Sequence, residues 1–555
     1  MGYDSGPAHP DTQVEHVYVL TGDSRETFDR VTRHLADVGL AVSRVQQSPP
    51  AVWVRGAAGA VNAALGVSLR RLPSPTGARP GLLGPPPVPD ALAGDVHAVL
   101  GLDTQHVMSA PGFGGLGSPL LGPNRTVVEL AEQYNFPAGT TGAGQKVGIV
   151  LLGGGIPDIS STFDDYFSSL CLKTPTITVS AVGGASNDPA DIADIEKALG
   201  GYVVPGSPLV TCSAGEPAVG PLPAPPPAPC AEAAAVISGG VTAGIAGEAE
   251  DCSPPTPDAA KDQINWTCEG IMDVELVGGA APGCEIIVYV CPNTAKGIFT
   301  AFTQALQDGV DVLTCSWGSA EFNLAPSYFK ALDSALMALS QKGVTICVSS
   351  GDRGSTPRAP ACSKLAVSFP ASSQYVLACG GNMRTQDIKT GVDVDIVWRE
   401  GSMGMYGSSG GGFSAHTPMP AWQTKYGVSY PNLPNSPPMR GVPDVCSESS
   451  YQSGIWLFYS QLNIKSAGTS AAAPVWAGLV TRLNEGLKAR VGNLSEHLYA
   501  PSVAATFVDV VAGDSSVITG IDAYEAQQGW DPCTGLGRPD GAALLTALQP
   551  LIPGA

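Results

Sequence analysis

The sequence has little charge, and basic residues are especially few. Charged residues make up 14% of the 555, and 29 Lys and Arg stand against 49 Asp and Glu, a formal net charge of -20 at pH 7. A surface of this sign repels a phosphate backbone, which argues against nucleic-acid binding. No stretch of 18 or more apolar residues runs free of Gly or Pro, so no membrane-spanning helix is expected.

Two further absences bear on the compartment. The N-terminus lacks the basic and apolar segments of a signal peptide, so none is expected.

All thirteen cysteines lie beyond the N-terminal region. Cys315 and Cys347 lie in apolar runs and are expected to be buried thiols. Cys212, Cys230 and Cys252 lie in polar, Pro-rich sequence, which predicts disulfides and favours an oxidising compartment.

The chain divides into regions of different composition. Residues 1–125 carry ten acidic and nine basic side chains, so the remainder holds nearly all of the net negative charge. Within residues 1–108, strand-like and helix-like patterns predict a compact α+β unit, and the Gly/Pro-rich stretch 109–123 reads as an exposed linker. In residues 124–555, apolar strand-like runs alternate with helical ones, which predicts an α/β domain with a parallel sheet. A Pro-rich stretch at about 199–263 predicts a surface insertion.

Ser470 is the first candidate for chemistry. It lies in SAGTSAAAPVWAGLVTRLNEGL at 466–487, where a turn of small residues opens an apolar, helix-forming run. At a helix N-terminus its hydroxyl would lie near unsatisfied N–H groups and the positive end of the helix dipole, which stabilise an anionic tetrahedral intermediate. The alternative is a Ser that caps the helix.

Histidine, the usual base for a serine nucleophile, is scarce in the larger region. Five of the seven histidines precede the linker, namely His9, His16, His34, His97 and His106. His497 lies in a helical stretch and His416 follows a Gly-rich loop, so neither is well placed as a base. A carboxylate must therefore be considered.

The best carboxylate set is CEGIMDVELVGGAAPG at 268–283. A separation of four residues places Glu269 and Asp273 on one helix face. Glu275 should point elsewhere, as a solvated or structural acid. A solvated face is the alternative for the pair too, but burial would make the two carboxyl groups share a proton and create a base that works in acid.

Asp352 is a third candidate acid. It follows the strand-like run VTICVSSG, at the end of a parallel strand where ligands bind. If burial raised its pKa, the protonated carboxyl group could donate a hydrogen bond to an oxyanion. The alternative is a turn Asp that caps its own backbone.

Together these segments resemble the sedolisin family of serine-carboxyl peptidases, which includes kumamolisin-like and tripeptidyl-peptidase-like members. The resemblance covers most of the chain and rests on motifs in the family's order: GAGQKVGIVLLGGG, ExxxDxE followed by GGAAPG, DVLTCSWG, VSSGDRG, FPASSQYVLACGG, SSGGGFS, RGVPDV, SAGTSAAAP and GWDPCTGLGRPDG. It implies a subtilisin-like, doubly wound α/β fold with a mostly parallel sheet and flanking helices, preceded by an α+β, ferredoxin-like propeptide.

The resemblance implies a role for each candidate. Ser470 would be the nucleophile, Glu269 its base and later acid, and Asp273 the partner of Glu269. Asp352 would stabilise the oxyanion.

Other segments match the family's binding sites. Trp317 would line the active site, and the SSGGGFS loop would pair its backbone with an extended peptide. The loop residues are Ser409, Gly410, Gly411 and Gly412. The alternative for the loop is simple flexibility. Where the family often has a Glu that hydrogen-bonds toward this Trp, the sequence has Leu151, so an extended proton relay is not carried over.

The C-terminal pattern FVDVVAGD followed by GWDPCTGLGRP, within about 505–545, resembles the family's calcium site. One structural Ca²⁺ is implied, and hard oxygen ligands suit this ion. The carboxylates would come from Asp509 and Asp531, and the backbone carbonyls from Val510, Gln527 and Gly529. Without the resemblance, two acids this far apart would be read as loop caps.

Residues 1–108 resemble the family's inhibitory propeptide, and the linker 109–123 fits its zone of autocatalytic cleavage in acid. Protonation of the five histidines in this part near pH 6 would weaken its hold on the catalytic domain. The implied partners are peptide or protein substrates and the chain's own propeptide as an intramolecular inhibitor, without nucleic acid or membrane. A monomer is expected.

The sequence thus predicts an acid-active peptidase, made as a zymogen, that works through an acyl-enzyme on Ser470 at about pH 3–5. Its compartment would be extracellular or lysosome-like and acidic. Endopeptidase and tripeptidyl-peptidase action both stay open. One alternative is a neutral subtilisin-like hydrolase that uses His416 or His497, and the other is a catalytically inactive homologue that binds peptides.

Overall fold

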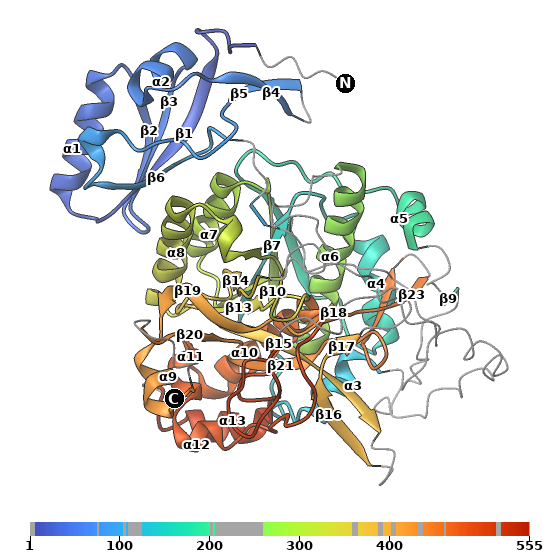
Figure 1. The fold of residues 1–555 in the computed structure, drawn as a ribbon. Helices are drawn as coiled ribbons and strands as arrows, with labels where there is room; N and C mark the ends of the chain where they lie inside the picture. Colours follow the sequence, from blue (N-terminus) through green and yellow to red (C-terminus); the bar gives the residue numbers. More distant parts are fainter. Residues whose placement is uncertain are drawn as a thin grey trace, which may run out of the picture.

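Two large β-sheets organise the chain in the computed structural model (Figure 1). The structure describes residues 6–74, 77–103, 107–108, 125–199, 204–205, 259–357, 364–386, 392–400, 407–429, 437–459, 462–517 and 523–553. A four-stranded sheet belongs to the N-terminal unit and an eight-stranded sheet to the larger domain. The predicted combination of an α+β unit and a mostly parallel α/β domain is confirmed.

The N-terminal sheet is antiparallel and has the order β2-β3-β1-β6. The elements of this unit are β1 (Gln13–Leu20), α1 (Arg25–Asp37), β2 (Ala41–Gln46), β3 (Ala51–Ala57), α2 (Ala58–Leu65), β4 (Arg70–Ser74), β5 (Gly77–Gly81) and β6 (Val96–Leu100). Successive side chains of a strand point to opposite faces. Tyr18 and Leu20 of β1 therefore lie in the unit's own core, whereas Val17 and Val19 belong to the core of the larger domain.

The larger sheet has the order β16-β15-β13-β11-β7-β10-β8, with β21 beside β15. Only the pairing of β15 with β16 is antiparallel among the described strands of this sheet. The strands are β7 (Lys146–Leu152), β8 (Thr176–Ala181), β10 (Glu285–Cys291), β11 (Val312–Cys315), β13 (Thr345–Ser349), β15 (Leu377–Gln386), β16 (Asp393–Val397) and β21 (Val445–Glu448). Continuous apolar runs such as VGIVLL of β7 are buried throughout, as a parallel sheet covered on both faces requires.

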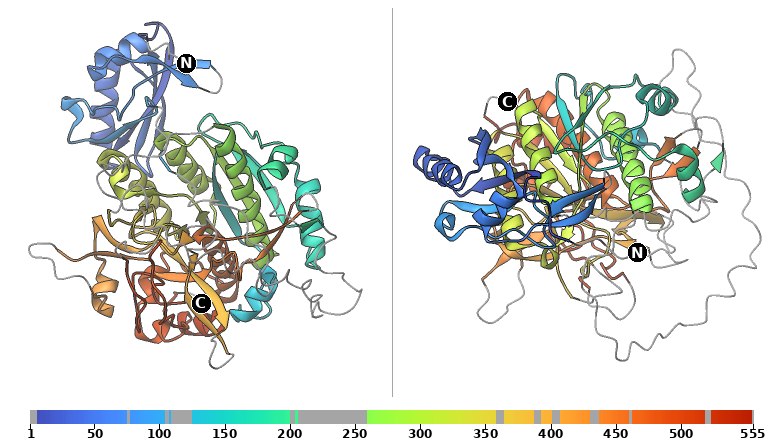
Figure 2. Two further views of the ribbon diagram at one scale, coloured as in Figure 1. Left: turned by 45° about the vertical axis from the view of Figure 1, so that its right-hand side comes forward. Right: turned by 90° about the horizontal axis from the view of Figure 1, so that it is seen from above.

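Helices cover both faces of this sheet (Figure 2). α7 (Ala295–Asp308) and α8 (Pro326–Gln341) pack together on one face, and α6 (Ala259–Ala280) and α10 (Thr469–Leu487) pack together on the other. The remaining elements are α3 (Val127–Gln133), α4 (Ile159–Ser169), α5 (Ile192–Leu199), α9 (Ala421–Tyr426), α11 (Ser495–Leu498), α12 (Pro501–Ala504), α13 (Gly541–Leu548), β9 (Val204–Pro205), β12 (Ser319–Ala320), β14 (Ser368–Phe369), β17 (Arg399–Glu400), β18 (Gly407–Ser408), β19 (Gly412–Pro418), β20 (Met439–Val442), β22 (Trp456–Tyr459) and β23 (Leu462–Lys465). None of the described helices has both the length and the apolar character that crossing a membrane requires.

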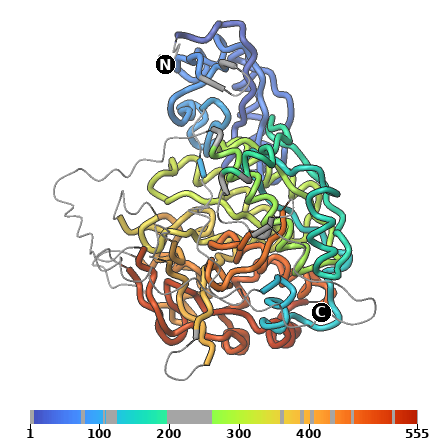
Figure 3. The backbone as a smooth tube through the Cα atoms, turned by 90° about the vertical axis from the view of Figure 1, so that its right-hand side faces the viewer, coloured from blue at the N-terminus to red at the C-terminus, as the bar shows by residue number. Residues whose placement is uncertain are grey.

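The N-terminal unit lies at one end of the molecule (Figure 3). Its sheet rests on α7 and α8. Its face with Val17 shares one hydrophobic core with these helices, and the ring centroids of Trp53 and Phe299 lie 6.2 Å apart. At the margin of this contact, the Lys296 ammonium donates to the Glu15 carbonyl over 3.3 Å and lies 3.8 Å from the Glu15 carboxylate. Apolar packing, this ion pair and further hydrogen bonds, such as that from the Gln307 amide to the Gln46 amide oxygen, therefore hold the unit in place.

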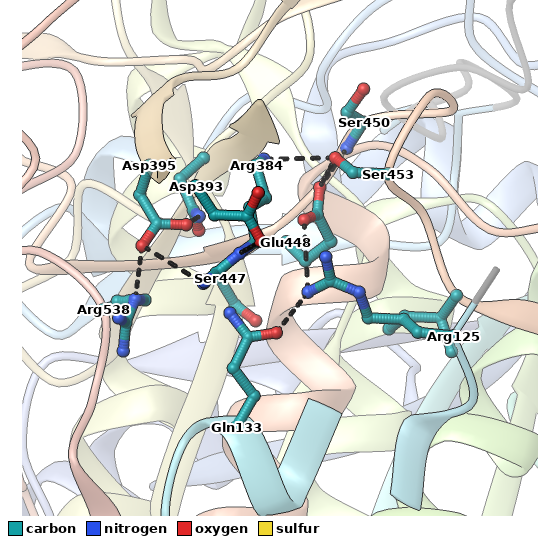
Figure 4. Close-up of polar contacts among 12 residues, drawn as sticks. Arg125, Gln133, Arg384, Asp393, Asp395, Ser447, Glu448, Ser450, Ser453 and Arg538 are labelled. Atoms are coloured by element: carbon teal, nitrogen blue, oxygen red, sulfur yellow. Dashed lines mark hydrogen bonds and ion pairs between the residues drawn. The ribbon is translucent and has the colours of Figure 1, made fainter. Parts of the chain in front are cut away.

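A buried polar network fixes the chain where the larger domain begins (Figure 4). The Arg125 guanidinium donates to the Gln133 amide oxygen over 2.5 Å and lies 3.8 Å from the Glu448 carboxylate. The Ser453 hydroxyl donates to the same carboxylate over 2.8 Å, and the Arg125 carbonyl accepts from the N–H of Trp456 over 2.9 Å. Burial raises the pKa of Glu448 to about 7, and the charge of Arg125 opposes this rise. Arg125 thereby ties α3, β21 and β22 together.

Two predicted segments fall largely outside the described residues. They are the linker 109–123 and most of the insertion at about 199–263. Where the insertion is described, it contains regular structure: β9 pairs with β23, and α6 already begins at Ala259. The ten residues from Ala259 to Cys268 include neither Gly nor Pro, so nothing stops the helix earlier.

The described cysteines other than Cys171 are buried, as predicted for Cys315 and Cys347. Eight described cysteines are free thiols, namely Cys268, Cys284, Cys291, Cys315, Cys347, Cys379, Cys446 and Cys533. Cys171 is disulfide-bonded. Cys212, Cys230 and Cys252 lie outside the described residues, so their disulfides stay predictions.

His16 is buried inside the N-terminal unit. It lies on β1, on the same face as Tyr18 and Leu20, and has no exposed surface. Among the described residues, neither of its ring nitrogens has a hydrogen-bond partner. Burial, and secondly the charge of Lys296, lower the pKa of His16 to about 4. An unpaired imidazole in this core must therefore stay neutral while the unit is folded.

The other predicted pH sensors are less suited to that role. His9 is exposed, His34 is only half-buried, and His106 lies outside the described residues. His97 is half-buried, and burial together with the charge of Lys330 lowers its pKa. Among the five histidines predicted to weaken the propeptide's hold in acid, His16 is therefore the best candidate, and His97 is the second.

We expect His16 to make the N-terminal unit less stable in acid. The pKa of His16 is about 4 in the folded state and 6.5 in the unfolded state. Above pH 6.5 the imidazole is neutral in both states and does not lower the free energy of unfolding. As the pH falls from 6.5 toward 4, only the unfolded state takes up the proton, so the free energy of unfolding decreases. The total loss is about 3 kcal/mol. Hydrogen exchange of the β1 amides in full-length Ser470→Ala protein, followed from pH 7 to pH 4, would measure it. In His16→Phe this pH dependence should shrink, and in His9→Gln it should persist. Persistence in both variants would contradict the assignment.

Candidate functional site

Segments from three parts of the chain meet at the carboxyl edge of the larger sheet. Ser470 is the second residue of α10, as predicted, so its N–H is among the first helical N–H groups, which have no acceptor within the helix. Ser316 follows β11 directly, and Asp352 lies three residues after β13. Glu269 and Asp273 approach from α6. The four predicted catalytic residues therefore share one location.

Glu269 and Asp273 are buried, which excludes a solvated face for the pair. The Ser316 hydroxyl donates to Asp273 Oδ1 over 2.9 Å. Within the described part of the chain, Glu269 Oε1 and Asp273 Oδ2 have no hydrogen-bond partner. Burial raises the pKa of both carboxyl groups, and the charge of Asp273 raises that of Glu269 further, while hydrogen bonding from Ser470 and Ser316 opposes the rise. Two carboxyl groups in this environment favour a state with one shared proton.

Glu275 lies on the same helix but bonds elsewhere. It is fully buried, so the prediction of a solvated acid is wrong and its structural alternative is right. Its Oε2 accepts from the N–H of Phe458 on β22 over 3.1 Å, and burial raises its pKa. The glutamate therefore links α6 to β22.

Ser316 joins the candidate nucleophile to Asp273. The Ser470 hydroxyl donates to the Ser316 carbonyl over 3.4 Å, and the Ser316 hydroxyl lies 3.3 Å from the Ser470 carbonyl. Sequence reasoning assigned no role to Ser316. Its position directly after the strand run DVLTC was the available signal.

Asp352 lies against the N-terminus of α10. Its Oδ1 accepts from the N–H of Thr469 over 2.7 Å and from the Thr469 hydroxyl over 2.8 Å. Burial raises the pKa of Asp352 to about 6, although these hydrogen bonds oppose the rise. A Cβ at Gly468 would collide with Asp352 Oδ2, and the φ of 84° there also favours glycine. The carboxyl group therefore bonds a neighbouring segment, which is not the predicted alternative of a cap for its own turn.

The predicted substrate loop is buried and closely packed. The Ser409 hydroxyl bonds to β15 and to the C-terminal segment. The N–H of Gly410 donates to the Gly351 carbonyl over 2.7 Å, and a Cβ at Gly411 would collide with the backbone of the C-terminal segment. Gly412 opens β19. The alternative of a flexible loop is therefore wrong, and backbone pairing with a peptide stays a prediction.

Trp317 lies in the core of the intact chain. It is fully buried, and its indole N–H donates to the Val150 carbonyl over 2.7 Å. The neighbouring Leu151 offers no side-chain acceptor, so the indole uses the backbone. This position does not support a role for Trp317 in lining the site.

The two histidines of the larger domain lie elsewhere. The His416 ring centroid is 5.2 Å from that of Phe329, and His497 lies on α11. Among the described residues, neither histidine forms a hydrogen bond with Ser470. This arrangement favours a carboxylate as the base.

The predicted calcium ligands gather around the C-terminal loop. Asp509 Oδ2 accepts from the N–H of Gly529 over 2.7 Å, and Asp531 accepts from the N–H of Gln527 over 3.2 Å. Val510 is buried beside them. In the described residues, no three His, Cys, Asp or Glu side chains form a metal cluster, and Asp509 Oδ1 is buried without a hydrogen-bond partner. A buried carboxylate oxygen without a hydrogen-bond partner fits a hard cation such as Ca²⁺.

Comparison with known proteins decides the family. Residues 9–105 match the family described as "Pro-kumamolisin, activation domain", and residues 239–507 match the "Subtilase family". Kumamolisin from Bacillus sp. (strain MN-32) is 32% identical over 543 residues, which cover 95% of this chain and 84% of kumamolisin. This chain belongs to the sedolisin family of serine peptidases.

Further relatives fit this sedolisin-family assignment. Tripeptidyl-peptidase 1 from Bos taurus is 33% identical over 305 residues, which cover 51% of this chain and 52% of that relative, about half its length. The structure of Pseudomonas sedolisin, a serine-carboxyl proteinase complexed with pseudo-iodotyrostatin, matches with a TM-score of 0.55 at 20% identity, and the match covers 78% of this chain and 99% of that one. This likeness shows the shared fold. The chain is therefore a serine peptidase that acts on peptides and carries an N-terminal inhibitory propeptide.

We expect loss of the Ser316 hydroxyl to impair catalysis. Ser316→Ala removes the donor to Asp273, so kcat should fall about tenfold. Without this donor the pKa of the pair rises, so the acidic limb of the pH–rate profile should move to higher pH. Thr314→Val is the matched control, because Thr314 is equally buried on β11 and, among the described residues, its hydroxyl has no hydrogen-bond partner. Identical profiles for the two variants would remove the special role of Ser316.

Proposed function

We propose that the chain is an acid-active serine-carboxyl peptidase that forms an acyl-enzyme on Ser470. The observation that carries this proposal is the buried carboxyl pair, Glu269 and Asp273, which Ser316 joins to Ser470. With one proton between them, the pair keeps one basic oxygen at a pH where an ordinary imidazole is already charged. Glu269 would take the hydroxyl proton as Ser470 attacks the scissile carbonyl and then give it to the leaving amine. Water would hydrolyse the ester by the same proton transfers.

Asp352 would supply the donor for the oxyanion. Its pKa of about 6 keeps the carboxyl group protonated in acid. With Oδ1 held by Thr469, the proton on Oδ2 would point to the developing oxyanion together with the N–H of Ser470. Ionisation replaces this donor by a negative charge, so activity should fall as the pH rises through about 6.

An acidic compartment, extracellular or lysosome-like, suits this chemistry. The carboxyl groups of the site need protons, and His16 loosens the propeptide as the pH falls. The positions of His416 and His497 support this proposal over the neutral hydrolase.

Acidification of the full-length protein tests the proposal. The chain and its Ser470→Ala variant are brought to pH 4, and their masses are followed over time. We expect loss of a fragment that corresponds to the predicted propeptide, in the unchanged chain alone, followed by cleavage of added peptide. Equal fragment release from both proteins would assign the cut to another protease, and no release from either would favour the inactive homologue.

Amide variants test the carboxyl pair separately. Glu269→Gln and Asp273→Asn should each lower kcat by about 10²- to 10⁴-fold. Glu275→Gln is the matched control, because Glu275 is buried on the same helix but bonds Phe458. Its turnover should stay near that of the parent enzyme. Full turnover in Glu269→Gln would falsify the proposed triad.

We also propose one structural Ca²⁺ in the C-terminal loop. Its ligands would be the carboxylates of Asp509 and Asp531 and the backbone carbonyls of Val510, Gln527 and Gly529. Among the described residues, the buried Asp509 Oδ1 has no hydrogen-bond partner, which supports this site. The ion would add oxygen coordination that fixes the loop.

Removal of Ca²⁺ should lower the melting temperature by several degrees, because an ion that binds only the folded state stabilises it. EGTA followed by excess Ca²⁺ in a thermal scan measures this effect. Asp509→Asn should lose most of the response. Asp158→Asn, at the N-cap of α4, should keep it. If EGTA left the melting temperature of the unchanged chain as it was, the calcium site would be contradicted.

A further inference from the structure

The turn between β10 and α7 holds the segment that leaves the propeptide. The Asn293 amide nitrogen donates to the Met108 carbonyl over 2.6 Å. The Asn293 amide oxygen accepts from the N–H of Met108 over 3.0 Å and from the N–H of Val107 over 3.2 Å. All three residues are buried. A single side chain therefore satisfies three backbone groups of the propeptide in a site closed to water.

This contact depends on backbone and apolar surface. A primary amide presents a donor and an acceptor side by side, as a strand edge does, so it can pair with any extended residue. The side chains of Val107 and Met108 lie in the core cluster of the larger domain. An extended, apolar stretch of peptide can therefore bind here through its backbone and its apolar side chains.

The same turn makes a second contact with the propeptide. Lys296, at the start of α7, donates to the Glu15 carbonyl over 3.3 Å. Its stem crosses Gly101, where a Cβ would lie only 2.5 Å from Lys296 Cδ. The absence of a side chain at Gly101 lets the propeptide close over Lys296 and places the exit segment against Asn293.

Asn293 lies on the sheet edge that carries the candidate active site. β7 separates β10 from β11, and Cys291, the last residue of β10, pairs with Leu152 of β7. Two strand spacings amount to roughly 10 Å between the ends of β10 and β11. About three extended residues span that distance. A peptide held at Asn293 can therefore reach Ser470 within a few residues.

We propose that Asn293 is a backbone-binding residue of the peptide path. In the intact chain it holds Val107–Met108, and in the mature enzyme it binds an extended, apolar stretch of substrate. The propeptide passes Asn293 before the predicted cleavage zone, so a substrate bound in the same direction places residues N-terminal to the scissile bond there. The substrate half of this inference rests on the proposed peptidase function, whereas the propeptide half stands on the hydrogen bonds alone.

Hydrogen exchange in full-length Ser470→Ala protein tests the propeptide half. Asn293→Ala should speed exchange of the Val107 and Met108 amides about tenfold or more. Asn293→Asp keeps the acceptor and regains a donor only when protonated, so its carbonyl contact should weaken more at pH 7 than at pH 4. Unchanged exchange in Asn293→Ala would overturn the proposal.

A matched control separates this contact from general loosening. The Asn187 amide pairs in the same way with Ile156, accepting from its N–H over 2.7 Å and donating to its carbonyl over 2.9 Å, within the larger domain. Asn187→Ala should leave exchange at Val107 and Met108 as in the parent protein. Faster exchange there in both variants would overturn a specific role for Asn293.

Substrates of two lengths test the other half. After acid activation, Asn293→Ala should raise KM about tenfold for a peptide with about five apolar residues before the scissile bond, with kcat nearly unchanged. A peptide with about two residues there should be cleaved equally by both enzymes. No rise, or an equal rise for both lengths, would overturn substrate binding at Asn293. If the parent enzyme cleaves no peptide, the proposed peptidase function fails, and the exchange experiment still decides the propeptide contact.

Discussion

Two carboxyl groups buried four residues apart on one helix constrain the whole site. Water is excluded from Glu269 and Asp273, so both cannot be charged together, and one proton has to stay with the pair. Asp352 is subject to the same constraint beside Thr469. A site built from carboxyl groups that are buried away from water binds protons more tightly than exposed acids do. Its dependence on acid would therefore come from burial rather than from any one catalytic residue.

The sheet explains how this site and its inhibitor share one molecule. α6 and α10 cover one face and bring the carboxyl pair to Ser470, whereas α7 and α8 cover the other face and hold the propeptide (Figure 1). The two arrangements meet at the carboxyl edge, where the turn before α7 holds the propeptide's exit segment. The propeptide body can therefore bind without covering the helices that carry the catalytic groups.

Much of the fold and the candidate site follows from the sequence, because strand–helix alternation and ordered motifs are local signals. They identified Ser470, Glu269, Asp273 and Asp352, which the structure brings together. Other features depend on partners that are distant in sequence. The burial of Glu275 requires β22, nearly two hundred residues later.

The misplaced and missed residues show the same limit. Trp317 was expected along the site, but its indole finds the backbone carbonyl of Val150 and turns into the core. Nothing in the sequence around Asn293 pointed to a role, because its amide finds its hydrogen-bond partner only when the fold brings Met108 beside it. Pairings of this kind become visible only in three dimensions.

The contacts of Arg125 limit the structural effect of proteolysis upstream of it. Its backbone already bridges Ile455, and its guanidinium is held by Gln133 and lies beside Glu448. Cuts at different bonds upstream would give ragged ends on an identical folded body. A mixture of such products would be heterogeneous in a mass spectrum yet behave as one species in melting and turnover, since every form keeps Arg125 and its contacts with Gln133 and Ile455.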